Sequence, residues 1–340
     1  MQWIRRGIIA VLVVAVAVVG LAYRVALHAE RPVGFQIVRA PDAGGAALPI
    51  GVWYPTPQRT WRLSQLGGVL MRVSRDGAVR GQALPLVVIS HGNGGSLVGH
   101  ADLAMTLASA GYVVAAPMHR GDNFMDQSHA GHATLFHDRV GELRATVTAL
   151  LTQWPAHARI DSTRIGAFGF SAGAVTVLAA AGAQPDLRRV ATECARAPEF
   201  ICRVFEATGS PLVGRTEVVS LPAFAHDARL RSIVLAAPGL GFTLDSASLA
   251  AISVPVQLWA SEADDAVPFA TNAGPISAML GRRVELHRVP LARHVSFLAP
   301  CGLIRPAALC EDPAGFDRRA FHAEMNAQVV AFFDARLRSQ

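Results

Sequence analysis

The 340-residue sequence contains no lysine, so all 31 of its basic residues are arginine. Against 25 acidic residues they leave a formal net charge of +6. The arginines are scattered along the chain, whereas proteins that bind nucleic acids gather positive charge on one face. We therefore expect no nucleic-acid partner. Hydrophobic residues make up 51% of the chain, which is enough for the core of one large domain.

The N-terminal segment, residues 1–29, has no charge in its centre and no cysteine. Arg5 and Arg6 precede an uncharged apolar run from Gly7 to Tyr23. This run is long for the core of a signal peptide and short for a membrane-spanning helix. We predict either an export signal cleaved after Ala29 or an uncleaved anchor in the inner membrane. The missing cysteine argues against lipid attachment of the lipoprotein type.

Cysteine is scarce in the rest of the chain. Both alternatives for the N-terminus place residues 30–340 outside the cytoplasm, in the periplasm or on the inner membrane, where disulfides form. The four cysteines allow three pairings. We expect the two local disulfides, Cys194–Cys202 and Cys301–Cys310, with free buried thiols as the alternative.

No pair of cysteines has the C-x-x-C spacing that is typical of metal sites. His129, His132 and His137 lie close together in the sequence, but their spacing matches no ligand pattern and no set of carboxylates accompanies them. We expect no metal and no cofactor.

Residues 30–340 alternate apolar runs with helical segments. The continuous apolar run at 86–90 is typical of a strand that is buried on both faces of a parallel sheet. Residues 112–116 and 256–260 are also expected to be strands. Alternating strands and helices predict an α/β fold in which helices flank a mainly parallel central sheet. The functional site of such a fold lies at the carboxyl ends of the strands.

Three segments interrupt this alternation. Residues 24–34 are expected to be a linker, and residues 55–84 an irregular insertion with a short helix. Residues 183–230 show no strand pattern and are expected to form a cap-like insertion, or lid, over the site.

The most informative stretch is Gly169–Gly173, which has the pattern G-x-S-x-G. An apolar strand-like run precedes it and an apolar helix-like run follows it, as in a nucleophile elbow. Both glycines are needed there because a side chain at either position would collide with the neighbouring strand or helix. We expect the turn to present the Ser171 hydroxyl at a helix N-terminus, where developing negative charge is favoured.

A serine hydroxyl becomes an effective nucleophile when a histidine accepts its proton and a carboxylate orients that histidine. In this topology the chain order is serine, acid, histidine. Asp264 follows the expected strand at 256–260, and His294 follows the next expected strand. We predict these two as acid and base, with Asp265 and Glu262 as alternative acids in the same loop.

An oxyanion hole needs two backbone N–H groups. We predict those of Ala172, directly after the serine, and Asn93, in the glycine-rich loop after the strand at 86–90. The segment Met118–Asn123 is expected at the rim of the pocket. His322, on the last expected helix, is expected at the surface.

Four stretches together resemble a known group of proteins; they are His91–Gly95, His119–Asn123, Gly169–Gly173 and His294–Cys301. The group comprises exported, serine-type dienelactone hydrolase-like proteins, which are similar to platelet-activating factor acetylhydrolases within the α/β-hydrolase superfamily. The resemblance covers about residues 35–335. It implies a triad of Ser171, Asp264 and His294, and ester hydrolysis without a cofactor.

Two positions depart from that group. Well-studied dienelactone hydrolases use a cysteine nucleophile, whereas this chain has Ser171, so cyclic dienelactones are not the expected substrates. The usual glycine before the histidine is Arg293.

We therefore expect a serine hydrolase that cleaves small or lipid-like carboxylic esters through an acyl-enzyme. One alternative is a phospholipase-like or lipase-like acyl hydrolase, such as a platelet-activating factor acetylhydrolase, associated with the membrane through residues 1–29. Another is a binding protein that keeps the fold without catalysis.

Overall fold

The computed structural model of the protein describes residues 2–41, 44–60, 63–214, 221–303 and 305–338. The strands are β1 (Val33–Pro41), β2 (Ala47–Pro55), β3 (Leu63–Leu66), β4 (Val69–Arg72), β5 (Ser74–Arg75), β6 (Leu84–Ser90), β7 (Val113–Pro117), β8 (Ile160–Phe170), β9 (Leu230–Ala236), β10 (Val256–Ala260) and β11 (Val284–Arg288). The helices are α1 (Gln2–Val25), α2 (Ala101–Ala110), α3 (Leu135–Thr152), α4 (Ala172–Ala180), α5 (Arg189–Arg196), α6 (Phe200–Ala207), α7 (Ala273–Leu280), α8 (Ala307–Cys310) and α9 (Arg318–Leu337).

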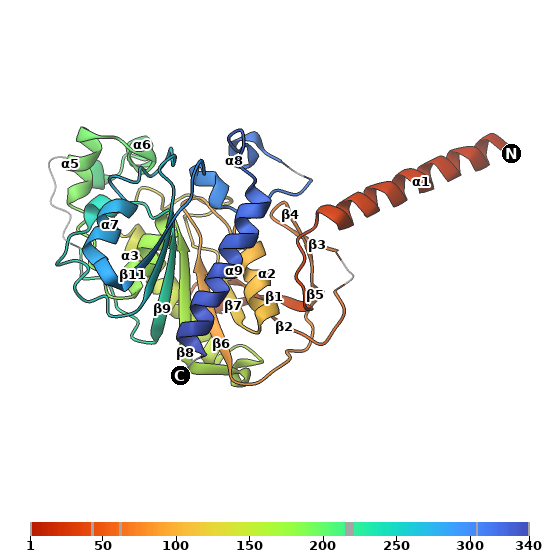
Figure 1. Ribbon diagram of the computed structural model, residues 1–340, viewed down its shortest axis with the longest axis horizontal. Helices are drawn as coiled ribbons and strands as arrows, with labels where there is room; N and C mark the ends of the chain where they lie inside the picture. Colours follow the sequence, from red (N-terminus) through yellow and green to blue (C-terminus); the bar gives the residue numbers. More distant parts are fainter. Residues whose placement is uncertain (1, 42–43, 61–62, 215–220, 304, 339–340) are drawn as a thin grey trace.

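Nine of these strands form one sheet in the described residues, in the order β11-β10-β9-β8-β6-β7-β2-β1-β5. The strands from β11 to β7 run parallel, whereas β2 pairs antiparallel with β7 and β1. Helices cover both faces (Figure 1). The predicted α/β fold with a mainly parallel central sheet is confirmed.

The central strands are apolar throughout because each face of the sheet carries a core of its own. Along β6, Val87 belongs to the core beneath α2 and α9, and Val88 belongs to the core beneath α3 and α4. This alternation follows from the period of two in a strand. All residues of β6, β7 and β10 are buried, as the continuous apolar run predicted for β6.

The expectation of an irregular segment with a short helix at residues 55–84 was wrong. In the described part of this segment, β3 and β4 form an antiparallel hairpin and β5 pairs with β1. Strands of two to four residues are too short to reveal their period in the sequence. The linker expected at residues 24–34 was also wrong in part, because α1 continues to Val25 and Leu27 forms a β-bridge with Met71.

Both predicted disulfides, Cys194–Cys202 and Cys301–Cys310, are present. The first joins α5 to α6, which lie in the segment 183–230 where we expected a cap. Residues 215–220 of that segment lie outside the described residues, as does Met1 of the N-terminal segment.

By length and composition, α1 is the one helix in the described part of the chain that is suited to crossing a membrane. Its residues Ile8–Val25 have a mean hydropathy of 2.6, and none of this stretch is buried. A signal sequence has the same character, so the helix by itself is compatible with both alternatives predicted for residues 1–29.

His322 lies in the interior, not at the surface as expected. Its Nδ1 is 2.6 Å from Oδ2 of Asp102, and its Nε2 is 2.9 Å from the carbonyl oxygen of Ser296. Burial opposes the charge of Asp102, but the interactions with His322 and Asn326 prevail and lower the pKa of Asp102 to about 2. This cluster ties α9 to α2, and neither helix reveals its partner in the sequence.

The burial of His100 makes the stability of the fold depend on pH. Its ring is buried against Phe168 and Phe170, and burial lowers its pKa from 6.5 to about 4. Between pH 6.5 and about pH 4, His100 binds a proton in the unfolded chain but not in the folded chain. The free energy of unfolding therefore falls as the pH falls through this range.

We expect the free energy of unfolding of the wild type to fall by about 3 kcal/mol more than that of His100→Gln between pH 7 and pH 4. Urea titrations of both proteins at a series of pH values measure this difference. Parallel pH profiles would contradict the assignment.

Candidate active site

Ser171 lies at the sharp turn between β8 and α4. Its φ is 54°, a left-handed conformation that non-glycine residues rarely adopt. A Cβ on Gly169 would overlap the backbone of Gly173, and a Cβ on Gly173 would overlap the carbonyl oxygen of Ser90 on β6. As the sequence predicted, α4 can begin against β6 and β8 because both positions are glycine.

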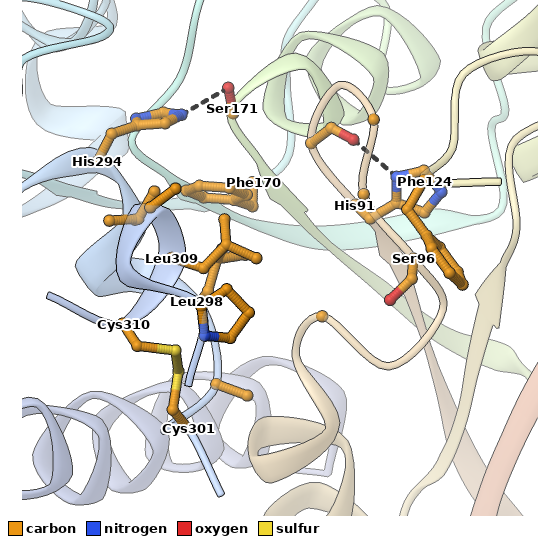
Figure 2. A pocket seen from close by; sticks show the side chains of 18 of the residues that line it. His91, Ser96, Phe124, Phe170, Ser171, His294, Leu298, Cys301, Leu309 and Cys310 are labelled. Carbon is orange, nitrogen blue, oxygen red and sulfur yellow. Dashed lines mark hydrogen bonds between the residues drawn. A yellow bond between two sulfur atoms is a disulfide. The ribbon is translucent and has the colours of Figure 1, made fainter. Parts of the chain in front are cut away.

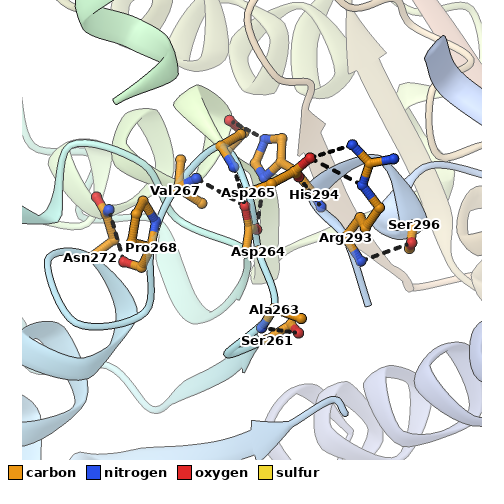
Figure 3. A network of polar contacts seen from close by, with 12 residues as sticks. Ser261, Ala263, Asp264, Asp265, Val267, Pro268, Asn272, Arg293, His294 and Ser296 are labelled. Carbon is orange, nitrogen blue, oxygen red and sulfur yellow. Dashed lines mark hydrogen bonds and ion pairs between the residues drawn. The ribbon is translucent and has the colours of Figure 1, made fainter. Parts of the chain in front are cut away.

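Ser171, His294 and Asp264 form a hydrogen-bonded series (Figures 2 and 3). Oγ of Ser171 is 2.9 Å from Nε2 of His294, and Nδ1 of His294 is 2.9 Å from Oδ2 of Asp264. The other carboxylate oxygen of Asp264 accepts the N–H groups of Ala266 and Val267, each at 2.9 Å. The carboxylate is therefore fixed on both sides.

The imidazole of His294 is also held in place by packing. Its ring stacks on Phe170, with 4.8 Å between the ring centroids. The side chain of Asp264 is 1% exposed and that of His294 is 12% exposed. Nδ1–H can donate to the carboxylate while Nε2 accepts the serine proton, which is the arrangement a general base requires.

The two alternative acids have other partners. Asp265 forms an ion pair with Arg293, and Glu262 forms one with Arg288. Burial opposes the charge of Asp265, but the hydrogen bond from Arg293 outweighs it, so the pKa of Asp265 is lowered. Arg293, which stands where the resembled group has glycine, thus neutralises the carboxylate next to Asp264 in sequence (Figure 3).

The two predicted oxyanion donors belong to segments that adjoin the serine. Ala172 is the first residue of α4, so its N–H has no carbonyl four residues earlier within the helix. The loop that carries Asn93 runs beside Ser171, because a Cβ on Gly92 would come within 3.3 Å of the serine Cβ. Among the described residues, no acceptor bonds to the N–H of Asn93.

The buried side chain of Asp122 fixes the loop that carries Asn93. Oδ1 of Asp122 accepts the side-chain amide of Asn93 at 2.6 Å and the N–H of Gly94 at 2.8 Å. Its Oδ2 accepts Nη1 of Arg139 at 2.5 Å. The side chains of Asp122 and Arg139 are 0% and 1% exposed, so their ion pair is shielded from water.

Arg139 extends this network into the fold. Its guanidinium also donates to the carbonyl oxygen of His91, and its Nε donates to Thr176 on α4 at 3.1 Å. Burial, together with the charges of His119 and Arg139, lowers the pKa of His91 well below its usual value. The neutral ring accepts the N–H of His119 at Nε2.

The segment Met118–Asn123 was expected at the pocket rim and instead lies largely beneath the loop. His119 and Asp122 are fully buried, and Nδ1 of His119 is 2.7 Å from Oε2 of Glu142 on α3. The residue after this segment, Phe124, lines the pocket. Sequence reasoning missed Arg139, because a lone arginine on an amphipathic helix gives no sign of a buried partner.

A cavity of about 630 Å³ lies over Ser171 and His294 (Figure 2). Its other walls come from separate parts of the chain; they are the β3–β4 turn, the glycine-rich loop, Phe170, Phe200 and Arg203, and the segment bridged by the second disulfide. Most of these walls are apolar, so the cavity suits an uncharged organic group close to the serine.

The three histidines that lie close together in the sequence do not line the cavity. His129 and His132 stack on each other, and His137 stacks on Phe224. Within the described residues, no group of three or more His, Cys, Asp or Glu side chains is arranged to hold a metal ion.

Comparison with known proteins gives two matches. The model of a family described as platelet-activating factor acetylhydrolase, isoform II, matches residues 60–153. This segment contains Asn93, Asp122 and Arg139 and ends before Ser171. A search of curated proteins finds no match.

Among solved structures, the chain is similar to a ferulic acid esterase from Streptomyces cinnamoneus. The TM-score is 0.57 at 19% sequence identity, over 93% of this chain and 94% of the esterase. At this level of identity the likeness is one of fold.

The Arg139–Asp122 pair yields a prediction about stability. Arg139→Leu leaves the Asp122 carboxylate buried without a counter-charge, which should lower the free energy of unfolding by about 3–5 kcal/mol. Arg196→Leu is the matched control, since Arg196 pairs with Glu193 at the surface and should change little. Urea unfolding of the three proteins measures the effect, and equal losses in the two variants would contradict it.

Proposed function

We propose that this chain, which belongs to the α/β-hydrolase superfamily by its fold, is a serine hydrolase that cleaves carboxylic esters. One observation carries the proposal, namely the series of hydrogen bonds from Ser171 through His294 to Asp264 beneath a largely apolar cavity. The match to an acetylhydrolase family and the esterase of similar fold support the same class of reaction.

In the first half of the reaction, Oγ of Ser171 attacks the ester carbonyl carbon while Nε2 of His294 takes the hydroxyl proton. Asp264 accepts the hydrogen bond from Nδ1–H and stabilises the imidazolium that forms. The carbonyl oxygen becomes an anion, which the N–H groups of Asn93 and Ala172 stabilise.

The imidazolium then protonates the departing alcohol as the ester C–O bond breaks. The acyl group remains on Ser171 until water attacks it, with His294 accepting a proton from the water. Return of that proton to the serine oxygen releases the carboxylic acid and restores the enzyme.

Asp122 and Arg139 serve this chemistry as positioning residues. The oxyanion donor of Asn93 is effective if it is aligned before the charge develops. Asp122 fixes the donor loop through Asn93 and Gly94, and Arg139 fixes Asp122.

We assign the remaining parts of the chain to the same function. Residues 183–230 act as a cap, which is supported by Phe200 and Arg203 of α6 in the cavity wall. The two disulfides and the apolar α1 support a location outside the cytoplasm for residues 30–340.

Replacement of the nucleophile tests the proposal. We expect Ser171→Ala to lower kcat for 4-nitrophenyl acetate by at least about 1,000-fold, because the other groups have no nucleophile to act with. Ser277→Ala, on α7, is the control for loss of a hydroxyl. Full turnover by a folded Ser171→Ala protein would exclude the assignment.

A pair of neighbouring substitutions tests the choice of acid. Asp264→Asn should lower kcat by about 10,000-fold, since an amide no longer favours the tautomer with a proton on Nδ1. Asp265→Asn keeps the contact between Asp264 and His294 and should lower kcat by less than about 10-fold. A larger loss in Asp265→Asn than in Asp264→Asn would identify the other carboxylate as the acid.

A further inference from the structure

The residues that follow α1 are built into the folded domain. Ala26 is buried. The N–H of Leu27 donates to the carbonyl oxygen of Leu70 at 2.8 Å, and the N–H of Arg72 donates to that of Leu27 at 2.9 Å. Leu27 therefore forms a single β-bridge, parallel to β4, at the edge of the β3–β4 hairpin. The Arg72 guanidinium also lies 4.6 Å from the ring centroid of Tyr23, on the last turns of α1.

These contacts favour a retained helix over a cleaved one. Cleavage after Ala29 would remove Leu27 from the edge of the hairpin and leave backbone groups of β4 without partners. It would also remove part of the cover from Met71, which is fully buried in the described structure. The folded domain keeps these stabilising contacts when α1 stays attached, as it would in an uncleaved membrane anchor.

The same hairpin reaches the cavity. Gly67 and Gly68 in its turn and Val69 at the start of β4 line the cavity over Ser171. Leu27 bonds to Leu70, the residue next to Val69, and each strand residue advances the chain by about 3.3 Å. The segment that follows α1 is thus bonded to the residue next to the cavity wall. Figure 1 shows α1 leaving the domain beside β4.

Exposed apolar side chains surround this mouth. In the described part of the chain beyond α1, eight large apolar side chains are exposed, and five of them belong to residues that line the cavity or directly follow a lining residue: Phe124, Met125, Phe200, Leu303 and Leu309. Three line the cavity, and the other two directly follow lining residues. They come from three separate segments, so they form one patch only in the folded protein. Clustered exposure of this kind marks an interaction surface.

The cation at this rim suits a lipid surface. Arg203 lies beside Phe200, with its guanidinium 6.0 Å from the ring centroid. Among the described residues, no carboxylate forms an ion pair with Arg203. An arginine among exposed aromatic and aliphatic side chains is suited to the boundary between headgroups and acyl chains.

We propose that the apolar rim of the cavity docks on the bilayer that holds α1, so that the ester reaches Ser171 from the membrane. The inference rests on the proposed hydrolase function and adds the surface from which the substrate arrives. The short path from α1 to Val69 holds one edge of the mouth at the membrane, and the five apolar side chains lie in the interface. Docking removes their exposed area from water, which favours the bound orientation.

A labelling experiment tests the docking independently of activity. The full-length chain with Met125→Cys carries an environment-sensitive fluorophore at that position and is reconstituted in vesicles of phosphatidylcholine and phosphatidylglycerol. Nitroxide groups on the lipid, near the headgroup, should quench this fluorophore at least about twofold because the rim lies within the interface. The matched control is Leu286→Cys on β11, away from the cavity, which should not be quenched. Equal quenching at both positions would overturn the proposal.

A kinetic comparison tests its consequence for substrate access. Met125→Asp/Leu303→Asp should reduce hydrolysis of 4-nitrophenyl palmitate embedded in the vesicles by about tenfold, because charge weakens docking. Hydrolysis of water-soluble 4-nitrophenyl acetate should stay unchanged, which also shows that the variant is folded. The control Ile37→Asp/Leu286→Asp places the same charge elsewhere and should retain both activities.

An equal loss on both substrates in the rim variant, or no loss on either, would contradict the proposal. A wild type that hydrolyses neither ester would refute the proposed hydrolase function, while the quenching result would still decide the docking. The docking proposal and the proposed hydrolase function are therefore contradicted by different results.

Discussion

The arrangement of the site depends on the close approach of α4 to β6 and β8. Gly169 and Gly173 allow this approach because neither has a Cβ that would overlap the backbone across the turn. The turn holds Ser171 in a left-handed conformation and places its hydroxyl within reach of His294. It also leaves the N–H of Ala172 at the first turn of a helix, where no carbonyl of that helix is available. One steric constraint thus positions both the proposed nucleophile and one of its proposed oxyanion donors.

A polar network beneath the site holds together the segments that surround this turn. Asp122 and Arg139 join the donor loop, the end of β6 and α4, which are distant in sequence. A buried ion pair of this kind costs desolvation free energy, which the attraction between its charges and its further hydrogen bonds offset, and those bonds hold the backbone in one arrangement. In a site whose proposed catalysis depends on aligned N–H groups, that fixed arrangement is the useful property.

Local patterns made much of the molecule predictable from its sequence. The apolar runs that become β6 and β10, the G-x-S-x-G turn and the carboxylates after a strand are all encoded over a few residues. The structure brings Ser171, Asp264 and His294 together, and both predicted disulfides close short loops.

What escaped prediction was decided by partners far away in the chain. The buried ring of His322 has a hydrogen-bond partner in Asp102 on α2. The buried ring of His119 has one in Glu142 on α3. Leu27 forms a β-bridge because β4 has a free edge beside it. None of these partners shows in the local sequence.

The apolar N-terminal helix and the cavity are linked by the same hairpin, so the proposed reaction and the proposed docking describe one orientation of the protein. The central claim is that Ser171 is an activated nucleophile. It is tested most directly by treating the full-length chain with a fluorophosphonate and mapping the adduct by mass spectrometry. We expect a single adduct on Ser171 that is lost in His294→Ala. A folded chain that stays unlabelled, or an adduct on another residue, would contradict the claim.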